Sequence, residues 1–293
     1  MQSTTRVHVG IGVGRGQAST VTASKPPRRA RSLGFLLTWL SVALAGCVIG
    51  MSLLAPLLAP YDPVAVDLAT GLQAPSAQHW LGTDQLGRDV ASRLLWAGRT
   101  SLSVTALVAL LTVTLGLTLG LVSGYCGGLI DDLAMGLTDL FYALPQIILT
   151  LALLGAVGPG TQTMIIALAA TGWMSYARLT RSLVLQWRSQ EFVLAAHALG
   201  APLRRILVRH LLPVVIKPVL VQMSLQVGGT ILTIAGLSFL GLGIQPPTPE
   251  WGAMLVDARP YLATALHLVL PPGLAVFLIV LGCNALAERL TQR

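Results

Sequence analysis

Long apolar stretches, separated by shorter polar segments, dominate the chain. Six of these stretches hold about 20 or more mostly apolar residues, enough for an α-helix to cross about 30 Å of hydrocarbon. Asp139 and Pro145 interrupt the third stretch, which neighbouring helices can accommodate by satisfying the backbone. The sequence therefore predicts an all-α, polytopic membrane protein with six transmembrane helices, over residues 33–58, 100–124, 133–156, 162–184, 214–240 and 266–287.

The composition supports the same prediction. Of the 293 residues, 54% are hydrophobic and only 10% are charged, and the mean hydropathy is +0.74. A soluble globular protein averages about 25% charged residues. These values exclude an ordinary cytosolic enzyme, a disordered protein and a secreted disulfide scaffold.

The distribution of positive charge predicts the orientation in the membrane. Fifteen of the 19 lysines and arginines fall in residues 1–32, in the segment from Arg178 to Lys217, and at the C-terminus. Six spans place these three regions on one side, which the positive-inside rule makes cytoplasmic. We therefore expect cytoplasmic termini, with residues 1–32 as a disordered tail, and we assign the net charge of +8 to topology rather than to nucleic acid.

Two segments on the opposite side have an unusual composition. Residues 59–99 and 241–265 are rich in turn-forming residues, and both hold tryptophan near an expected membrane interface. We expect them to form an ordered external cap on a six-span domain that covers residues 33–293.

Motifs that carry chemistry are missing from the sequence. There is no Gly-Lys pair for a phosphate-binding loop, no His-Glu-x-x-His, no Gly-x-Ser-x-Gly and no Cys-x-x-Cys. The sequence thus predicts no catalytic residue, no cofactor-binding residue and no metal site. Asp139 is the one fair candidate for an ionisable group inside a span, and we expect it to make an interhelical polar contact rather than relay protons.

The cytoplasmic loop over residues 186–213 is the most informative segment. Its first half has apolar residues at helical spacing, Gly200 is placed to end that helix, and Pro202 suits the start of a second short helix. Such a pair of helices either anchors in lipid or docks a soluble partner. The small side chains of Ala195 and Ala196 favour docking, since they permit close backbone approach.

This loop resembles the Glu-Ala-Ala loop of ABC importer permeases. Ala195, Ala196, Gly200, Leu212 and Pro213 match that pattern in register. Leu194 stands where the family has an acidic residue, whereas Glu191 supplies an acid one turn earlier. Residues 79–90 and 237–252 resemble regions of the dipeptide, oligopeptide and nickel permeases, closest to the second-permease type and the nickel branch.

The resemblance implies a type I importer permease fold in a bacterial inner membrane. It also implies a second homologous permease, a substrate-binding protein, and two ABC ATPase subunits that bind ATP and Mg, so that this chain carries no cofactor and no catalysis. The residues expected to couple the chain to an ATPase are Glu191, Ala195, Ala196, Gly200, Arg204, Arg205, Leu212 and Pro213. Arg204 and Arg205 suit either the rim of that contact or lipid headgroups.

The substrate stays open between nickel, metal chelates and di- or oligopeptides. The alternative function is that of a secondary carrier that acts alone and is driven by an ion gradient. The scarcity of ionisable residues within the predicted spans disfavours this alternative.

Overall fold

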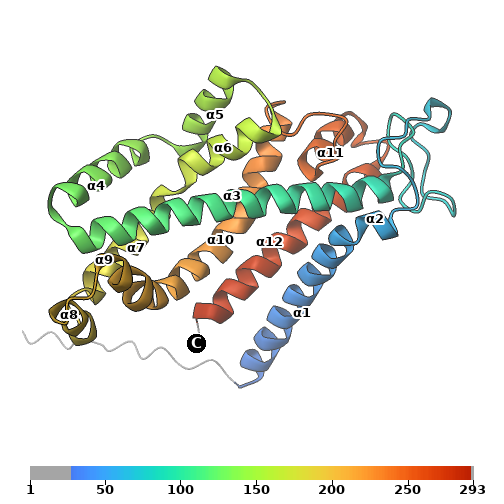
Figure 1. Ribbon diagram of the computed structural model, residues 1–293. Coiled ribbons are helices and arrows are strands. Elements are labelled where there is room, and N and C mark those ends of the chain that lie inside the picture. The colour runs from blue at the N-terminus through green and yellow to red at the C-terminus, as the bar shows by residue number, and fades with distance from the viewer. Residues whose placement is uncertain (1–27, 292–293) are drawn as a thin grey trace, which may run out of the picture. The chain divides into compact units, whose positions relative to one another are not determined.

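The computed structural model describes residues 28–291, and it describes the side chains of residues 36–289. Residues 1–36 and 37–293 form two separate units, the second of which holds the helical bundle (Figure 1). Residues 1–27 of the predicted tail lie outside the described residues. Residues 28–32 are helical, so the first helix begins five residues before its predicted start.

Helices make up most of the described chain. They are α1 (Arg28–Leu53), α2 (Ala55–Leu58), α3 (Val90–Cys126), α4 (Gly128–Tyr142), α5 (Gln146–Val157), α6 (Thr161–Gly172), α7 (Met174–Trp187), α8 (Glu191–Ala198), α9 (Leu203–Arg205), α10 (Leu212–Phe239), α11 (Trp251–Ala258) and α12 (Leu270–Thr291). Single 3₁₀ turns occur at Leu68–Thr70, Arg259–Tyr261 and Leu266–Leu268, and a π-helical segment at Ile206–Leu211 joins α9 to α10.

Four of the predicted spans correspond to single helices long and apolar enough to cross a membrane. These helices cover Leu36–Leu53, Val90–Cys126, Leu203–Phe239 and Leu266–Arg289. The first ends at Leu53, five residues before its predicted end, because a break at Leu54 separates α1 from α2. The third of them is longer, because α9 and the π-helical segment extend α10 toward the preceding loop.

The other two predicted spans are interrupted. Over residues 133–156, α4 and α5 meet at a bend of 86°. Pro145 at this bend has no backbone N–H and disfavours a helical Leu144, so the helix cannot continue. Over residues 162–184, a break at Trp173 separates α6 from α7. Between residues 28 and 291, length and composition thus identify four spans, or five when the bent pair counts as one.

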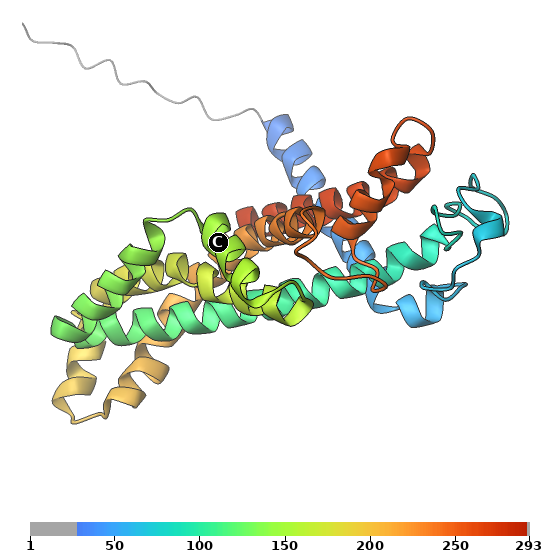
Figure 2. The same ribbon diagram turned by 90° about the horizontal axis from the view of Figure 1, so that it is seen from above.

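The long helix α3 packs along the shorter α7 (Figure 2). Gly116, Gly120 and Gly124 of α3 face α7 at intervals of four residues. A Cβ atom at Gly120 would lie 2.6 Å from the carbonyl oxygen of Ala177 and 2.6 Å from the Cβ of Thr180. Small residues at this spacing let two backbones approach closely, which is how helices commonly pack in membranes.

The two segments predicted to form a cap pack against each other. Glu250 lies 1% exposed before α11, accepts hydrogen bonds of 2.8 Å from the N–H groups of Gly252 and Ala253, and accepts another of 3.1 Å from Ser101 of α3. The indole N–H of Trp251 donates to the carbonyl of Leu94 at 3.2 Å. These contacts join residues about 150 positions apart in the sequence, so both segments are ordered.

An ionic cluster strengthens this junction. Asp84 pairs with Arg88 at 2.7 Å and with Arg93 at 3.3 Å, and Asp257 lies 3.5 and 3.7 Å from the same two arginines. Asp89 begins α3 by accepting a hydrogen bond from the N–H of Ser92 at 2.7 Å. The cluster ties residues 59–99 to α11 through side chains that are mostly buried.

Candidate functional site

The loop over residues 186–213 forms the predicted helix pair. A residue with a left-handed backbone, Gly200, follows the end of α8, and its φ is +73°. The N–H of Gly200 donates to the carbonyl of His197 at 2.9 Å, and the N–H of Ala201 donates to that of Ala196 at 3.0 Å. These two bonds constitute a Schellman motif, which satisfies the final carbonyls of the helix. Pro202 then precedes α9, so both predicted helix boundaries are confirmed.

The second helix of the pair differs from the prediction. It was expected to be short, whereas α9 continues through Ile206–Leu211 into α10 as one helical stretch over Leu203–Phe239. Pro213 does not break this stretch. It follows directly on the π-helical segment Ile206–Leu211, in which the regular α-helical hydrogen-bond pattern is already interrupted. The loop is therefore directly connected to a membrane-spanning helix.

The loop has a small apolar core of its own. Val193 and Ala196 of α8 are buried against Val184, Ile206 and Leu211. The two neighbouring alanines therefore differ in their surroundings: Ala195 is exposed, while Ala196 packs inward. Of the eight residues predicted to couple, six are exposed, namely Glu191, Ala195, Gly200, Arg204, Arg205 and Pro213, while Ala196 is buried and Leu212 is half-buried.

Sequence reasoning did not identify which apolar side chains of this loop stay exposed. These are Phe192, Leu194, Leu199, Leu203 and Val208, three of which are leucines. Leu194, Leu199 and Leu203 are 55%, 87% and 45% exposed. They lie next to the exposed coupling residues, and we call these three leucines together with Ala195 the docking surface. The sequence does contain one indication of such a surface. Helix α8 has apolar residues beyond Val193 and Ala196, the two that form its buried face.

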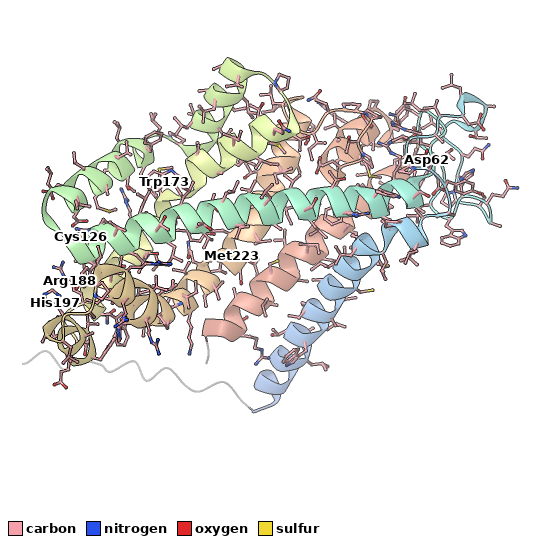
Figure 3. The ribbon with its side chains drawn as sticks, viewed as in Figure 1. Asp62, Cys126, Trp173, Arg188, His197 and Met223 are labelled. Atoms are coloured by element: carbon pink, nitrogen blue, oxygen red, sulfur yellow. The ribbon has the colours of Figure 1, made fainter. Side chains whose placement is uncertain are left out.

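Polar contacts fix the loop against the end of α3. The guanidinium of Arg188 donates to the carbonyl of Gly124 at 3.0 Å, and the hydroxyl of Tyr125 lies 3.4 Å from Nδ1 of His197. Figure 3 shows Arg188 and His197 near Cys126, at the end of the bundle opposite Asp62. The docking surface and the cap segments therefore lie at opposite ends of the long helix α3.

A cavity of about 690 Å³ lies between these two ends. It is bounded by the two helix breaks, at residues 142–146 and 172–176, together with the middle of α3 and α10. The lining residues are Val108, Ala109, Thr112, Tyr142, Ala143, Leu144, Pro145, Gln146, Leu168, Thr171, Gly172, Met174, Ser175, Tyr176, Leu225, Gln226, Val227, Gly229, Thr230 and Thr233.

The lining of the cavity combines apolar with polar, uncharged side chains. Its lining offers hydroxyl and amide groups, but no carboxylate, ammonium, guanidinium or imidazole. The amide of Gln226 donates to the hydroxyl of Ser175 at 3.0 Å, which connects α10 to α7. Thr150 and Thr171 share a buried hydrogen bond of 2.9 Å between α5 and α6. Such a lining can hydrate or hydrogen-bond a solute in passage without holding a bare ion tightly.

Two ion pairs join α4 to α7. Arg181 binds Asp131 with two hydrogen bonds of 2.6 Å, and Arg178 binds Asp139 at 2.6 Å. The prediction that Asp139 makes an interhelical polar contact is confirmed. Among the described residues, no group of three His, Cys, Asp or Glu side chains lies close enough to hold a metal ion.

The comparisons with known proteins agree with this architecture. Residues 116–293 match the family described as binding-protein-dependent transport system inner membrane component. The chain is 44% identical over 260 residues to the nickel transport system permease protein NikC of Escherichia coli K12, covering 87% of this chain and 94% of that protein.

Two further relatives are named for other substrates. The dipeptide transport system permease protein DppC of Alkalihalophilus pseudofirmus is 40% identical over 240 residues, covering 82% of this chain and 79% of that protein. The glutathione transport system permease protein GsiD of Escherichia coli O1:K1 is 41% identical over 244 residues, covering 83% and 80%.

These findings define an ABC importer permease, an all-helical inner-membrane subunit with several spans and the type I importer permease fold. The chain belongs to the family of binding-protein-dependent transport system inner membrane components, within the dipeptide, oligopeptide and nickel permeases. Members of this family are non-catalytic subunits that work with ABC transporter partners such as a binding protein and an ATPase.

Proposed function

We propose that this chain is one of two permease subunits in an ATP-driven importer. It forms half of the translocation path, and its docking surface receives a separate ATPase subunit, one of two that bind ATP and Mg. The chain itself holds no cofactor and no metal, and a substrate-binding protein delivers the substrate to the side of the cap segments. Both termini and the loop over residues 186–213 lie in the cytoplasm.

The exposure of the docking surface is the observation that carries this proposal. Leu199 is 87% exposed at the tip of the loop, although the loop has its own core around Val193 and Ala196. A lipid anchor would suit these leucines as well. Exposed Glu191, Arg204 and Arg205 lie close to them in the sequence, and a polar rim beside an apolar centre is typical of protein interfaces.

The path is assigned to the cavity because of its location and lining. It lies within the bundle, between the cap segments and the docking surface, and it is walled by the two interrupted spans. Irregular backbone at membrane depth is tolerated where it lines a water-filled cavity or is covered by protein. The partner permease would complete the wall.

For the substrate we propose nickel or a metal chelate, with di- or oligopeptides as the second candidate class. The 44% identity to a nickel permease supports the first class, while the relatives for dipeptide and glutathione support the second. Accumulation of nickel and of a labelled dipeptide, compared between a deletion strain and its complemented parent, separates the two classes.

Docking is tested with a bulky substitution at Ala195. Ala195→Trp should abolish copurification of the ATPase subunits with the tagged chain, whereas Ala263→Trp, at another exposed site in the cap segments, should leave it intact. Undiminished copurification of the Ala195→Trp variant contradicts the docking assignment. Transport by the purified chain alone in proteoliposomes would instead establish the secondary carrier.

A further inference from the structure

A residue that does not line the cavity contacts one of the side chains that do, Tyr142. Tyr142 is the last residue of α4 and lines the cavity. The guanidinium carbon of Arg178 lies 4.1 Å from the centre of the Tyr142 ring. A cation this close to an aromatic face is attracted by the ring quadrupole. The orientation of this aromatic wall therefore depends on a residue that does not line the cavity itself.

Asp139 in turn fixes Arg178. A terminal nitrogen of Arg178 donates to Asp139 at 2.6 Å, and the backbone N–H of Ala143 donates to the carbonyl of Asp139 at 3.0 Å. Asp139 is thus bound to α7 through its side chain and to the 86° bend through its backbone. We call Asp139, Arg178 and Tyr142 the tyrosine clamp.

The exposure of the clamp indicates which way it faces. The side chains of Arg178 and Asp139 are 43% and 66% exposed, although both residues fall in stretches that hydropathy predicts to span the membrane. An ion pair turned toward hydrocarbon is costly, and such pairs normally face protein or a water-filled cavity. This face of α4 and α7 therefore adjoins the path or the partner subunit rather than lipid.

We propose that Arg178, held by Asp139, is a positioning residue for transport: it fixes the Tyr142 ring as a wall of the cavity through which the substrate passes. The proposal rests on the proposed function, because it takes the cavity to be part of the path. The pair between Asp131 and Arg181 joins the same two helices. Among the described residues it makes no ring contact like that of Arg178 with Tyr142, so it provides a matched control.

The test uses the complete importer in proteoliposomes, with nickel ions, nickel–histidine and a labelled dipeptide as probes, and measures substrate transported per ATP hydrolysed. Arg178→Gln should lower this ratio about fivefold in the native background and in the Tyr142→Phe background, which keeps the ring. In the Tyr142→Leu background, Arg178→Gln should change the ratio less than about twofold, because the ring on which Arg178 acts is absent.

Two further variants distinguish a role of Arg178 in orienting the Tyr142 ring from a role in only holding α4 against α7. Arg178→Lys keeps a cation over the ring and should retain the ratio within about twofold. Asp131→Asn should lower thermal stability but leave the ratio unchanged. Equal losses for Arg178→Gln in all three backgrounds, no loss in the native background, or an equal loss for Asp131→Asn overturns the proposal.

One cavity variant distinguishes this proposal from the proposed function. Gln226→Leu removes an amide from the cavity lining. If Gln226→Leu lowers transport and Arg178→Gln does not, the tyrosine clamp is wrong and the path stands. If neither variant changes transport by the assembled complex, the path is not this cavity, and both proposals fail.

Discussion

Arg181 of α7 donates two hydrogen bonds of 2.6 Å to the two carboxylate oxygens of Asp131 in α4. The two residues are 50 positions apart in the sequence, and Asp131 is one of only two buried residues in α4. The inward face of this helix is thus held largely by charge, while its leucines point outward. Paired arginine–carboxylate bonds of this kind are among the strongest that side chains make.

Removing the charge of Asp131 should loosen α4. Asp131→Asn preserves the side-chain size but leaves Arg181 without its ionic partner, which should destabilise the protein by about 1–3 kcal/mol. The measurement is the thermal unfolding midpoint of the purified protein in detergent. Asp132→Asn, at the exposed neighbouring position, should leave the midpoint unchanged. Equal midpoints for the two variants would refute a structural role for this pair.

The glycines of α3 should tolerate no side chain. In Gly120→Ala, the new methyl group would lie 2.6 Å from atoms of Ala177 and Thr180. Overpacking of this kind costs about 1–3 kcal/mol, again measured by thermal unfolding.

The control for this substitution is an open glycine in another helix. A Cβ atom at Gly136 of α4 meets nothing within 4 Å. Gly136→Ala should therefore be neutral or stabilising by up to about 1 kcal/mol, since alanine favours helix more than glycine does. If Gly120→Ala behaves like Gly136→Ala, the close packing of α3 on α7 is wrong.

Glu250 should control the junction of the two cap segments. Glu250→Gln replaces one of the carboxylate oxygens that accept hydrogen bonds from Gly252, Ala253 and Ser101 with an NH₂ group. The expected loss is about 1–3 kcal/mol, because a buried backbone donor is left unsatisfied. Faster limited proteolysis within residues 59–99 and 241–265 is the readout.

Asp62 provides the comparison for Glu250. Its carboxylate accepts one hydrogen bond of 2.9 Å from the exposed N–H of Val64. Asparagine can make the same bond, so Asp62→Asn should be cleaved at the native rate. A native rate for Glu250→Gln as well would contradict the assigned role of Glu250.

Leu199 should contribute to docking without contributing to folding. Because its side chain is 87% exposed, Leu199→Asp should change stability by no more than about 0.5 kcal/mol. Burial of a leucine in an interface is worth about 1.5–3 kcal/mol, so the same variant should retain about tenfold less ATPase in copurification. Leu262→Asp, 52% exposed in the cap segments, should retain the native amount, and a similar loss there would indicate a non-specific effect.

The docking loop illustrates which features of the structure could be predicted from the sequence. Gly200 and Pro202 define the turn of the docking loop through local backbone preferences, and those preferences act whatever the rest of the chain does. Ala195 and Ala196 are different, because both are small and neighbouring, and only packing against Val184 and Ile206 decides that Ala196 faces inward.

By itself the sequence determined the membrane class, four single-helix spans, the helix pair of the docking loop and the resemblance to importer permeases, since these depend on composition, helical periodicity and local turns. Tertiary structure decided the rest. Hydropathy predicts continuous spans over residues 133–156 and 162–184. It depends on composition alone, so it cannot predict the 86° bend between α4 and α5 or the break at Trp173. The cavity, the arginine–aspartate pairs and the glycine contacts join residues distant in sequence, and only the packing of α3, α4, α7 and α10 brings them together.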